Sequence, residues 1–230
     1  MITISNRLEK VTTYIPKGST LADIGSDHAF LPCFAVQKGI ISKAIAGEVN
    51  EGPFRSAYNQ VKALGLEDKI EVRLGDGLEV IDPYEVSAVV IAGMGGQLIS
   101  NILERGKERL QGIERLILQP NMGARFIRDW FEKNNWKLIG ESILEEDEKI
   151  YEILVAKPTN VQNTFNDTER LLGPFLMNEC NSTFEKKWKR EKENWERILI
   201  QLEKALPTQE ICERKELLKQ KINAVTEAIK

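Results

Sequence analysis

Short apolar runs and helix-like stretches alternate along this chain from residue 20 to residue 134. The run at 88–92, Ala-Val-Val-Ile-Ala, contains no polar residue, which is typical of a parallel strand covered on both faces by helices. Strands separated by helices favour a parallel sheet with right-handed crossovers. We therefore predict an α/β, doubly wound domain, with strands at 20–24, 43–47, 70–74, 88–92 and 115–119 and helices at 5–15, 30–38, 53–64, 97–104 and 125–134.

Two further strands, predicted at 137–145 and 149–156, are joined by a short acidic turn at 146–148. So short a connection predicts an antiparallel hairpin. A mostly parallel sheet that ends in such a hairpin is distinctive of Rossmann-like methyltransferases, whereas dinucleotide dehydrogenases more often finish with another parallel strand. The pattern predicts a Rossmann-like class I methyltransferase domain at residues 1–158.

The pattern changes after Pro158. The stretch 159–166 is polar and linker-like, and Gly173-Pro174 ends one helix and begins another. We predict that residues 159–230 form an α-helical, coiled-coil-like domain built on an antiparallel helical hairpin that turns at Pro207. Its apolar residues recur at coiled-coil spacings of three, four and seven: Phe184, Trp188, Trp195, Ile198, Leu202, Ala205, Ile211, Leu218, Ile222, Val225 and Ile229.

The composition argues against several classes of protein. The first seven residues lack the apolar stretch of a signal peptide, and no run approaches the length of a membrane helix, so we expect a cytoplasmic protein. His28 is the only histidine and the three cysteines lie far apart, so no metal site is expected. The net charge of −3 is unusual for a nucleic-acid binder. The sequence leaves the oligomeric state open, with a monomer favoured.

An acidic, glycine-containing run at 23–28, Asp-Ile-Gly-Ser-Asp-His, follows the first predicted strand. Ligands of open α/β sheets bind at the carboxyl ends of strands, and Gly25 lets the backbone approach a ligand closely. Only one glycine of the dinucleotide pattern GxGxxG is present, and Asp23 and Asp27 would repel a pyrophosphate. They would attract the cationic amino and sulfonium groups of S-adenosylmethionine. An acidic turn that caps the next helix is the alternative.

Further acids and glycines follow the next three predicted strands. A carboxylate at Glu48 would accept hydrogen bonds from ribose hydroxyls, and one at Asp76 would meet the exocyclic amine of adenine. The glycines at 93, 95 and 96 would let a ligand approach the backbone. Together the loops predict a site for S-adenosylmethionine formed by Asp23, Gly25, His28, Glu48, Val49, Asn50, Asp76, Gly77, Gly93, Met94 and Gly95.

The loop expected after the fifth strand, Gln119-Pro120-Asn121, offers side-chain amides that both donate and accept hydrogen bonds. We predict that Gln119, Pro120 and Asn121 contact the methyl acceptor, either at a base edge or at an exocyclic amine. A plain turn set by Pro120 is the alternative. The segment is also similar to the N-P-P-type motif of N6-adenine and glutamine methyltransferases.

Three segments, taken in order and spacing, closely resemble the bacterial tRNA (adenine-22-N1)-methyltransferases: 23–28 (DIGSDH), 91–96 (IAGMGG) and 116–121 (LILQPN). The resemblance extends over most of the chain, including 173–175 (GPF) and the helical tail. It implies methylation of N1 of an adenine in the D-arm region of tRNA, at position 22, with S-adenosylmethionine as methyl donor. It also implies a Rossmann-like domain followed by a coiled-coil-like helical domain.

Asp27 is the predicted catalytic residue. Adenine N1 carries a free lone pair, so a nearby carboxylate is needed only to stabilise the base as it becomes positively charged and to accept a proton from N6. The resemblance also favours Asp27, because the matching acid of the family is linked to catalysis. We expect His28 to contact the cofactor or to be structural. Because N1 faces the pairing partner in double-stranded RNA, the target base must be unpaired or flipped out, into a pocket beside Asp27 and Met94.

A basic run in the tail predicts contacts with the tRNA backbone: Lys186, Lys187, Lys189, Arg190 and Lys192. The alternative is that Trp188 and Trp195 pack inside the hairpin while these charges form a solvated face. Two rival functions also remain open. One is a methyltransferase acting on another RNA base or on an exocyclic or amide nitrogen. The other is a non-catalytic, cofactor-binding adaptor whose helical tail recruits a partner.

Overall fold

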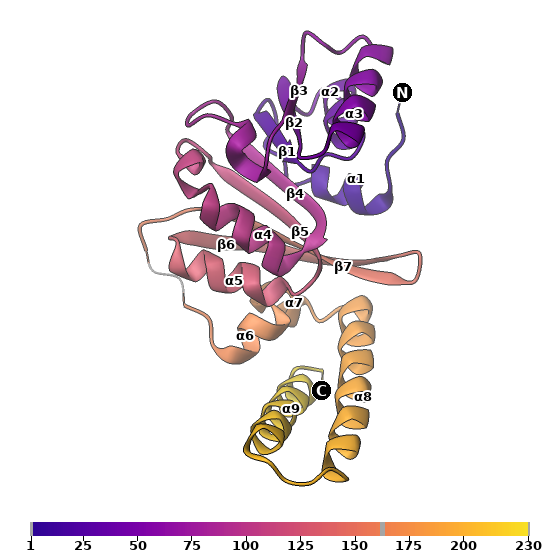
Figure 1. Cartoon of the computed structure of the whole chain (residues 1–230), viewed down its shortest axis with the longest axis vertical. Coiled ribbons are helices and arrows are strands. Elements are labelled where there is room, and N and C mark those ends of the chain that lie inside the picture. Colours follow the sequence, from indigo (N-terminus) through magenta and orange to yellow (C-terminus); the bar gives the residue numbers. More distant parts are fainter. Residues whose placement is uncertain (1, 162–163, 230) are drawn as a thin grey trace. The chain divides into compact units, whose positions relative to one another are not determined.

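The computed structural model describes residues 2–161 and 164–229. The chain divides into two compact units, Met1–Thr164 and Phe165–Lys230, and Figure 1 colours them from indigo to yellow along the sequence. The predicted domain boundary after Pro158 falls at the end of the last strand, before the division between the two compact units at Thr164. The predicted linker 159–166 includes residues 162 and 163, which lie outside the described residues.

The first unit is built on a seven-stranded sheet with the order β3-β2-β1-β4-β5-β7-β6 (Figure 1). Strands β1 to β5 are parallel, whereas β7 pairs antiparallel with both β5 and β6. The predicted parallel sheet with a closing hairpin is therefore confirmed. The strands are β1 (Thr20–Ile24), β2 (Lys43–Glu48), β3 (Ile70–Leu74), β4 (Ala88–Gly95), β5 (Arg115–Met122), β6 (Trp136–Glu146) and β7 (Lys149–Pro158).

Helices cover both faces of this sheet. Val90 of β4 belongs to a core that also contains Val11 of α1 and Val61 of α3. Its neighbours Val89 and Ile91 point to the opposite face and are equally buried, where α4 and α5 pack against each other and against β4 to β7. The helices of this unit are α1 (Asn6–Thr12), α2 (Phe30–Gln37), α3 (Glu51–Ala63), α4 (Gly96–Arg105) and α5 (Ala124–Lys133), with the 3₁₀ helices η1 (Gly77–Val80) and η2 (Lys107–Leu110).

Some element boundaries differ from the prediction in ways that matter for the site. Strand β4 continues to Gly95 and β5 to Met122, so residues 93–95 and 119–121 lie at strand ends rather than in loops. The register between these strands shifts at Met94, because β4 bulges there. Helix α1 ends at Thr12 instead of residue 15, and the sequence did not predict η1 or η2.

The second unit is helical, and its helices are α6 (Asp167–Leu172), α7 (Pro174–Glu179), α8 (Ser182–Glu203) and α9 (Gln209–Ala228). Gly173, with φ of 90°, separates α6 from α7 as predicted. The Sγ atom of Cys180, just before α8, lies 3.6 Å from the carbonyl oxygen of Ala228 at the end of α9. The start of α8 therefore lies beside the end of α9, and the two long helices are antiparallel. Phe184 and Trp188 are buried, which agrees with a helical hairpin whose aromatic residues pack inside.

A buried ion cluster joins α5 to the closing hairpin of the first unit. Arg128 of α5 donates to Glu141 of β6 at 2.7 Å and to Glu152 of β7 at 2.8 Å, and all three side chains are at most 3% exposed. The cluster fixes α5 against the hairpin strands of the sheet. At the turn end of that hairpin, the Glu146 carboxylate accepts backbone N–H bonds from the start of α1. The hairpin therefore holds the N-terminal helix in place.

Replacing Arg128 with methionine should lower the free energy of unfolding by about 3–5 kcal/mol, because Glu141 and Glu152 would stay buried without a cation. The triple variant Arg128→Met/Glu141→Gln/Glu152→Gln should recover much of that loss, since no buried charge remains. The control Arg55→Met removes an exposed pair with Glu51 and should cost less than about 1 kcal/mol. Urea unfolding monitored by circular dichroism measures all three. An Arg128→Met variant as stable as Arg55→Met would contradict the prediction.

Candidate functional site

The carboxyl ends of β1, β2 and β3 lie side by side at one edge of the sheet. The backbone N–H of Gly25 donates to the carbonyl oxygen of Gly47 at 2.9 Å, and that of Gly75 donates to the carbonyl oxygen of Glu48 at 2.8 Å. These bonds continue the parallel ladders past the strand ends and hold the three loops together. Acidic residues at the carboxyl ends of all three strands thus gather at the edge where ligands of open α/β sheets bind.

Asp23, in β1, is only 4% exposed. Its carboxylate accepts a hydrogen bond from the Ser26 hydroxyl, which favours the charged form. Burial outweighs this bond, and the nearby carboxylates of Glu48 and Asp27 add to the effect of burial, so the pKa of Asp23 rises from 3.8 to about 7. A buried carboxylate with a raised pKa is a strong partner for a cation that displaces its proton.

Glu48, the last residue of β2, is also buried, and burial raises its pKa. Its carboxylate accepts the backbone N–H of Asp27, so the loop after β1 is tied directly to the end of β2. The next residue, Val49, is 57% exposed. Asn50 precedes α3, and its side chain makes no capping bond to that helix. Of the residues predicted here to contact the cofactor, Glu48 is therefore a buried acid, Val49 is exposed, and Asn50 does not use its side chain to cap α3.

The turn after Ser26 has an unusual backbone. Asp27, His28 and Ala29 have φ values of 42°, 64° and 53°, a left-handed conformation that costs roughly 1–2 kcal/mol for each residue other than glycine. The Asp27 side chain is 85% exposed, and its Oδ1 lies 3.7 Å from His28 Nε2. The His28 ring stacks on Phe30, with centroids 5.3 Å apart. The strained turn thus presents an exposed carboxylate beside the buried ones.

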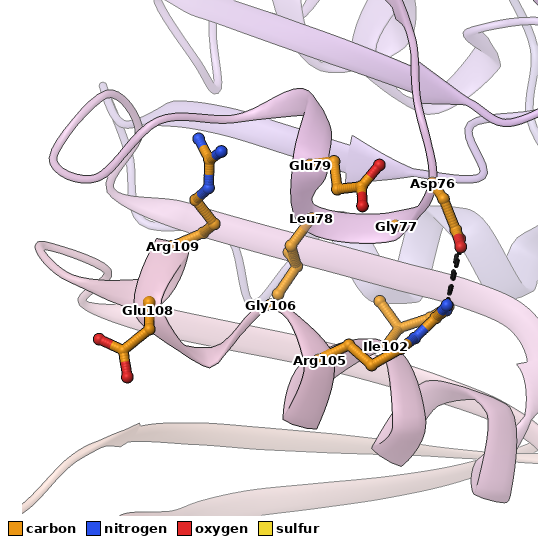
Figure 2. A pocket seen from close by; sticks show the side chains of 9 residues that line it. All are labelled: Asp76, Gly77, Leu78, Glu79, Ile102, Arg105, Gly106, Glu108 and Arg109. Carbon is orange, nitrogen blue, oxygen red and sulfur yellow. Dashed lines mark hydrogen bonds and ion pairs between the residues drawn. The ribbon is translucent and has the colours of Figure 1, made fainter.

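Asp76 follows β3 and precedes η1. Its carboxylate forms a two-point ion pair with Arg105 of α4, at 2.8 and 3.3 Å. Figure 2 shows Arg105 reaching from α4 to Asp76 along a pocket of about 240 Å³. Gly77, with φ of 60°, is packed so closely that a Cβ there would lie 2.9 Å from Ile102. The last turn of α4 therefore supports both residues of the loop at which the sequence predicts adenine.

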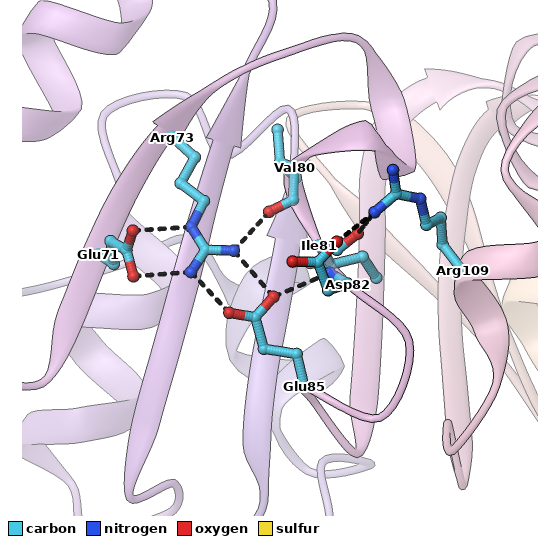
Figure 3. Close-up of polar contacts among 7 residues, drawn as sticks. All are labelled: Glu71, Arg73, Val80, Ile81, Asp82, Glu85 and Arg109. Atoms are coloured by element: carbon cyan, nitrogen blue, oxygen red, sulfur yellow. Dashed lines mark hydrogen bonds and ion pairs between the residues drawn. The ribbon is translucent and has the colours of Figure 1, made fainter.

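Two arginines anchor the segment that follows η1 (Figure 3). Arg73 of β3 pairs with Glu85 and donates to the carbonyl oxygen of Val80 at 2.8 Å. Arg109 of η2 pairs with Asp82. These contacts hold residues 80–85 against the sheet. They therefore support the Asp76 loop from its C-terminal side, through η1.

Two side chains of β5 clamp Gly93. Its N–H donates to Gln119 Oε1 at 3.0 Å, and its carbonyl oxygen accepts from Asn121 Nδ2 at 2.7 Å. With φ of 78°, Gly93 begins the bulge that aims the next side chain, Met94, at the first loop. There a Cβ on Gly25 would lie 2.3 Å from the terminal methyl of Met94. Met94 thus connects β5, the predicted acceptor strand, to the predicted cofactor loop.

Gln119 is wholly buried, and its amide oxygen also accepts a bond from the guanidinium of Arg7. The side chain therefore supports Gly93 from inside the protein. Pro120 is also buried, whereas Asn121 is exposed. Arg7, which the sequence did not single out, comes from α1 and lies 5.2 Å over the ring of Tyr151. No local pattern marks Arg7, because only the tertiary fold brings α1 to this edge of the sheet.

The basic residues predicted to contact tRNA lie on α8, in the second unit. Lys189 pairs with Glu185 at 2.7 Å, and the ammonium of Lys187 lies 4.9 Å over the ring of Trp188. Trp188 is 4% exposed and packs edge-on against Phe184, as expected for an interior aromatic residue. The exposed members of the basic run are Lys186, Lys189 and Arg190.

Over residues 2–161 and 164–229, no group of three or more His, Cys, Asp or Glu side chains is arranged to hold a metal ion. No helix in the described part of the chain is long and apolar enough to cross a membrane. The thiols of Cys33, Cys180 and Cys212 are free.

A family model described as tRNA (adenine(22)-N(1))-methyltransferase matches residues 21–227 of this chain. A relative of that name from Bacillus subtilis (strain 168) is 49% identical over 231 residues, which cover 96% of this chain and 97% of the relative. The crystal structure of the B. subtilis m1A22 tRNA methyltransferase matches with a TM-score of 0.96 at 46% identity, covering 100% of both chains. A putative tRNA (m1A22) methyltransferase of Streptococcus pneumoniae, in complex with S-adenosyl-L-methionine, matches with a TM-score of 0.90 at 42% identity, covering 99% of this chain and 100% of that one.

A sheet of this order, with an acidic edge and a closing antiparallel hairpin, defines a Rossmann-like methyltransferase. Within that class, the chain belongs to the tRNA (adenine(22)-N(1))-methyltransferase family. The resemblance identified from the three sequence segments is thereby confirmed.

Asp23→Asn should stabilise the protein at and above pH 7. The stability contributed by protonated Asp23 is fully present below pH 3.8 and is lost as the pH rises to about 7, where the buried group becomes charged. Asparagine stays neutral and keeps an oxygen for the Ser26 hydroxyl, so Tm at pH 8 should rise by about 2 °C or more.

Thermal melts from pH 5 to pH 8, without added ligand, test this expectation. The gap between variant and wild type should widen with pH, whereas the exposed control Asp68→Asn should follow the wild type throughout. A constant gap for Asp23→Asn would contradict the assignment.

Proposed function

We propose that this protein transfers the methyl group of S-adenosylmethionine to N1 of adenine 22 in tRNA. The observation that carries the proposal is the row of acids at the ends of β1, β2 and β3, in a chain of this family. We further propose that the protein acts in the cytoplasm.

The residues of this edge fit S-adenosylmethionine in charge. Its amino and sulfonium groups are cationic and would offset the unfavourable burial of Asp23. Glu48 would accept hydrogen bonds from the ribose, with Val49 and Asn50 beside it, and Asp76 would accept one from the adenine amine. Glycines allow the backbone to approach the ligand: Gly25, Gly77, Gly93 and Gly95. When bound, the cofactor supplies a methyl group on a good leaving group.

Asp27 is the proposed catalytic group. Its carboxylate is exposed, and its backbone is fixed by the bond to Glu48, so the side chain can face an incoming base. The adenine N1 lone pair would form the new bond to the methyl carbon while the bond from that carbon to the sulfonium sulfur breaks, so the positive charge passes from sulfur to the base. The Asp27 carboxylate would stabilise that charge and accept a proton from N6. His28, which stacks on Phe30, would flank the site without acting as a base.

On the acceptor side, Asn121 and Met94 are the proposed contacts with the base. Gln119 and Pro120 are buried, so we assign them the support of Gly93 and of the strand end rather than direct contact. An exocyclic-amine acceptor would need a side-chain amide oxygen to accept a hydrogen bond from the amine. The Gln119 oxygen already accepts bonds from Gly93 and Arg7 inside the protein, whereas the bond from Asn121 Nδ2 to Gly93 leaves the Asn121 oxygen able to accept.

Incubation with unmodified tRNA and labelled S-adenosylmethionine, followed by nucleoside analysis, should yield 1-methyladenosine. Asp27→Asn should lower kcat by about 100-fold or more, because a neutral amide stabilises a cationic base poorly. Asn tolerates the left-handed backbone, so the turn should be retained. The matched control is Asp147→Asn in the hairpin turn, where an aspartate also has positive φ, and it should retain full activity.

The absence of 1-methyladenosine would refute the assignment to N1, and 6-methyladenosine would favour the exocyclic alternative. Full turnover by Asp27→Asn would show that Asp27 is not the catalytic group. If the wild type binds S-adenosylmethionine but methylates no RNA, the adaptor alternative is favoured.

We also propose that the exposed cations of α8 contact the tRNA backbone. The double variant Lys186→Glu/Arg190→Glu should raise KM for tRNA by about tenfold and leave KM for S-adenosylmethionine unchanged, because phosphate contacts act on RNA binding alone. The control is Arg214→Glu/Lys219→Glu, which reverses two exposed charges on α9. Equal effects of the two double variants would refute a specific role for α8. Steady-state kinetics at fixed ionic strength measures both constants.

A further inference from the structure

We infer that Arg105 of α4 is a positioning residue for cofactor recognition: it aims the carboxylate of Asp76 at the exocyclic amine of adenine. The inference rests on the proposed function and deepens it, because it names a residue that would set the preference for an adenine base in the cofactor. Arg105 itself need not touch the cofactor.

The geometry of the pair supports this role. Arg105 Nη1 and Nη2 contact the two carboxylate oxygens of Asp76 at 2.8 and 3.3 Å (Figure 2). A planar guanidinium fork bound at two points fixes the rotation of a carboxylate, which a single lysine contact would not do. Each carboxylate oxygen still has a further lone pair, so Asp76 keeps the capacity to accept a bond from an amine.

Arg105 is itself well placed to act as a support. It is the last residue of α4, where the helix dipole favours a cation, and Gly106 caps the helix. Three residues earlier, Ile102 packs against Gly77, and a Cβ at Gly77 would lie only 2.9 Å from it. The same helical turn therefore contacts both residues of the adenine loop, one by charge and one by packing.

The ion pair is not explained by stability. The side chains of Arg105 and Asp76 are 59% and 47% exposed, and exposed pairs contribute little to folding. The nearby pair of Lys107 and Glu104 has a similar length, 2.9 Å, and similar exposure, 51% for each side chain. Neither Lys107 nor Glu104 lines the pocket beside Asp76, so this second pair provides a matched control.

The test uses two ligands that differ at one group. S-adenosylhomocysteine presents an amine at position 6 of the purine, whereas S-inosylhomocysteine presents a carbonyl oxygen that would face the Asp76 carboxylate. The wild type should bind the adenosine ligand at least about tenfold more tightly, because one hydrogen bond to a charged group is lost and a repulsion is gained. Isothermal titration calorimetry on the full chain gives both Kd values.

Arg105→Gln should reduce this preference about three- to fivefold, mainly by weakening binding of the adenosine ligand. Lys107→Gln should leave the preference unchanged. Asp76→Asn should reduce it strongly, and adding Arg105→Gln to Asp76→Asn should then change nothing further, because Arg105 acts through the carboxylate. Equal Tm values for Arg105→Gln and Lys107→Gln would show that any difference in binding is not due to unfolding.

A change of both Kd values by the same factor in Arg105→Gln would overturn the inference, since Arg105 would then act on binding in general. So would an effect of Arg105→Gln that persists in the Asp76→Asn background. The proposed function fails in a different way: the wild type would then bind neither ligand. A wild type that binds both ligands equally would retain the proposed function but would remove Asp76, and with it Arg105, from recognition of the base.

Discussion

The burial of two neighbouring carboxylates, Asp23 and Glu48, is the constraint on which the rest of the site depends. Removing a carboxylate from water is costly unless a cation or several donors replace the water. Here the fold supplies one hydroxyl, from Ser26, and one backbone N–H, from Asp27, and the pKa of Asp23 still rises to about 7. A cationic ligand at this edge would therefore offset the unfavourable burial of the two carboxylates. The carboxylates of Asp23 and Glu48 thus lower the stability of the fold, and the same two groups would bind the cationic cofactor.

A second constraint joins the two sides of the site. Arg7 holds Gln119, Gln119 holds Gly93, and the bulge at Gly93 directs Met94 against Gly25. The start of this chain of contacts is fixed by the closing hairpin, through the cap at Glu146 and the buried cluster around Arg128. A base bound near Asn121 and a cofactor bound near Gly25 would thus meet one continuous, packed support. Methyl transfer depends mainly on such positioning, because the chemistry is a single displacement.

The sequence predicted the elements whose signals are local. The apolar run at 88–92 and the acidic glycine turn at 23–28 each contain the features that define them, so the sheet and its acidic edge followed from the pattern. The ends of β4 and β5 did not, because Met94 and Pro120 become strand residues only by pairing with each other. The burial of Gln119 was missed for the same reason: its partner Arg7 lies 112 residues away in the chain. Arg105 was missed because its ion pair with Asp76 spans 29 residues.

The net charge of −3 is unusual for a protein with an RNA substrate, but several of the negative charges lie inside the protein. Asp23 and Glu48 are buried, and the Arg128 cluster encloses two carboxylates around one guanidinium. Asp23 and Glu48 each carry one formal negative charge, and the two carboxylates and one guanidinium of the Arg128 cluster sum to one more. These buried groups together equal the formal net charge of −3. A phosphate backbone is held by contacts with exposed cations, not by the total charge of the chain. A bound sulfonium or amino group would also offset Asp23. The surface available to RNA is therefore less acidic than the composition indicates, which removes the main objection to a tRNA substrate.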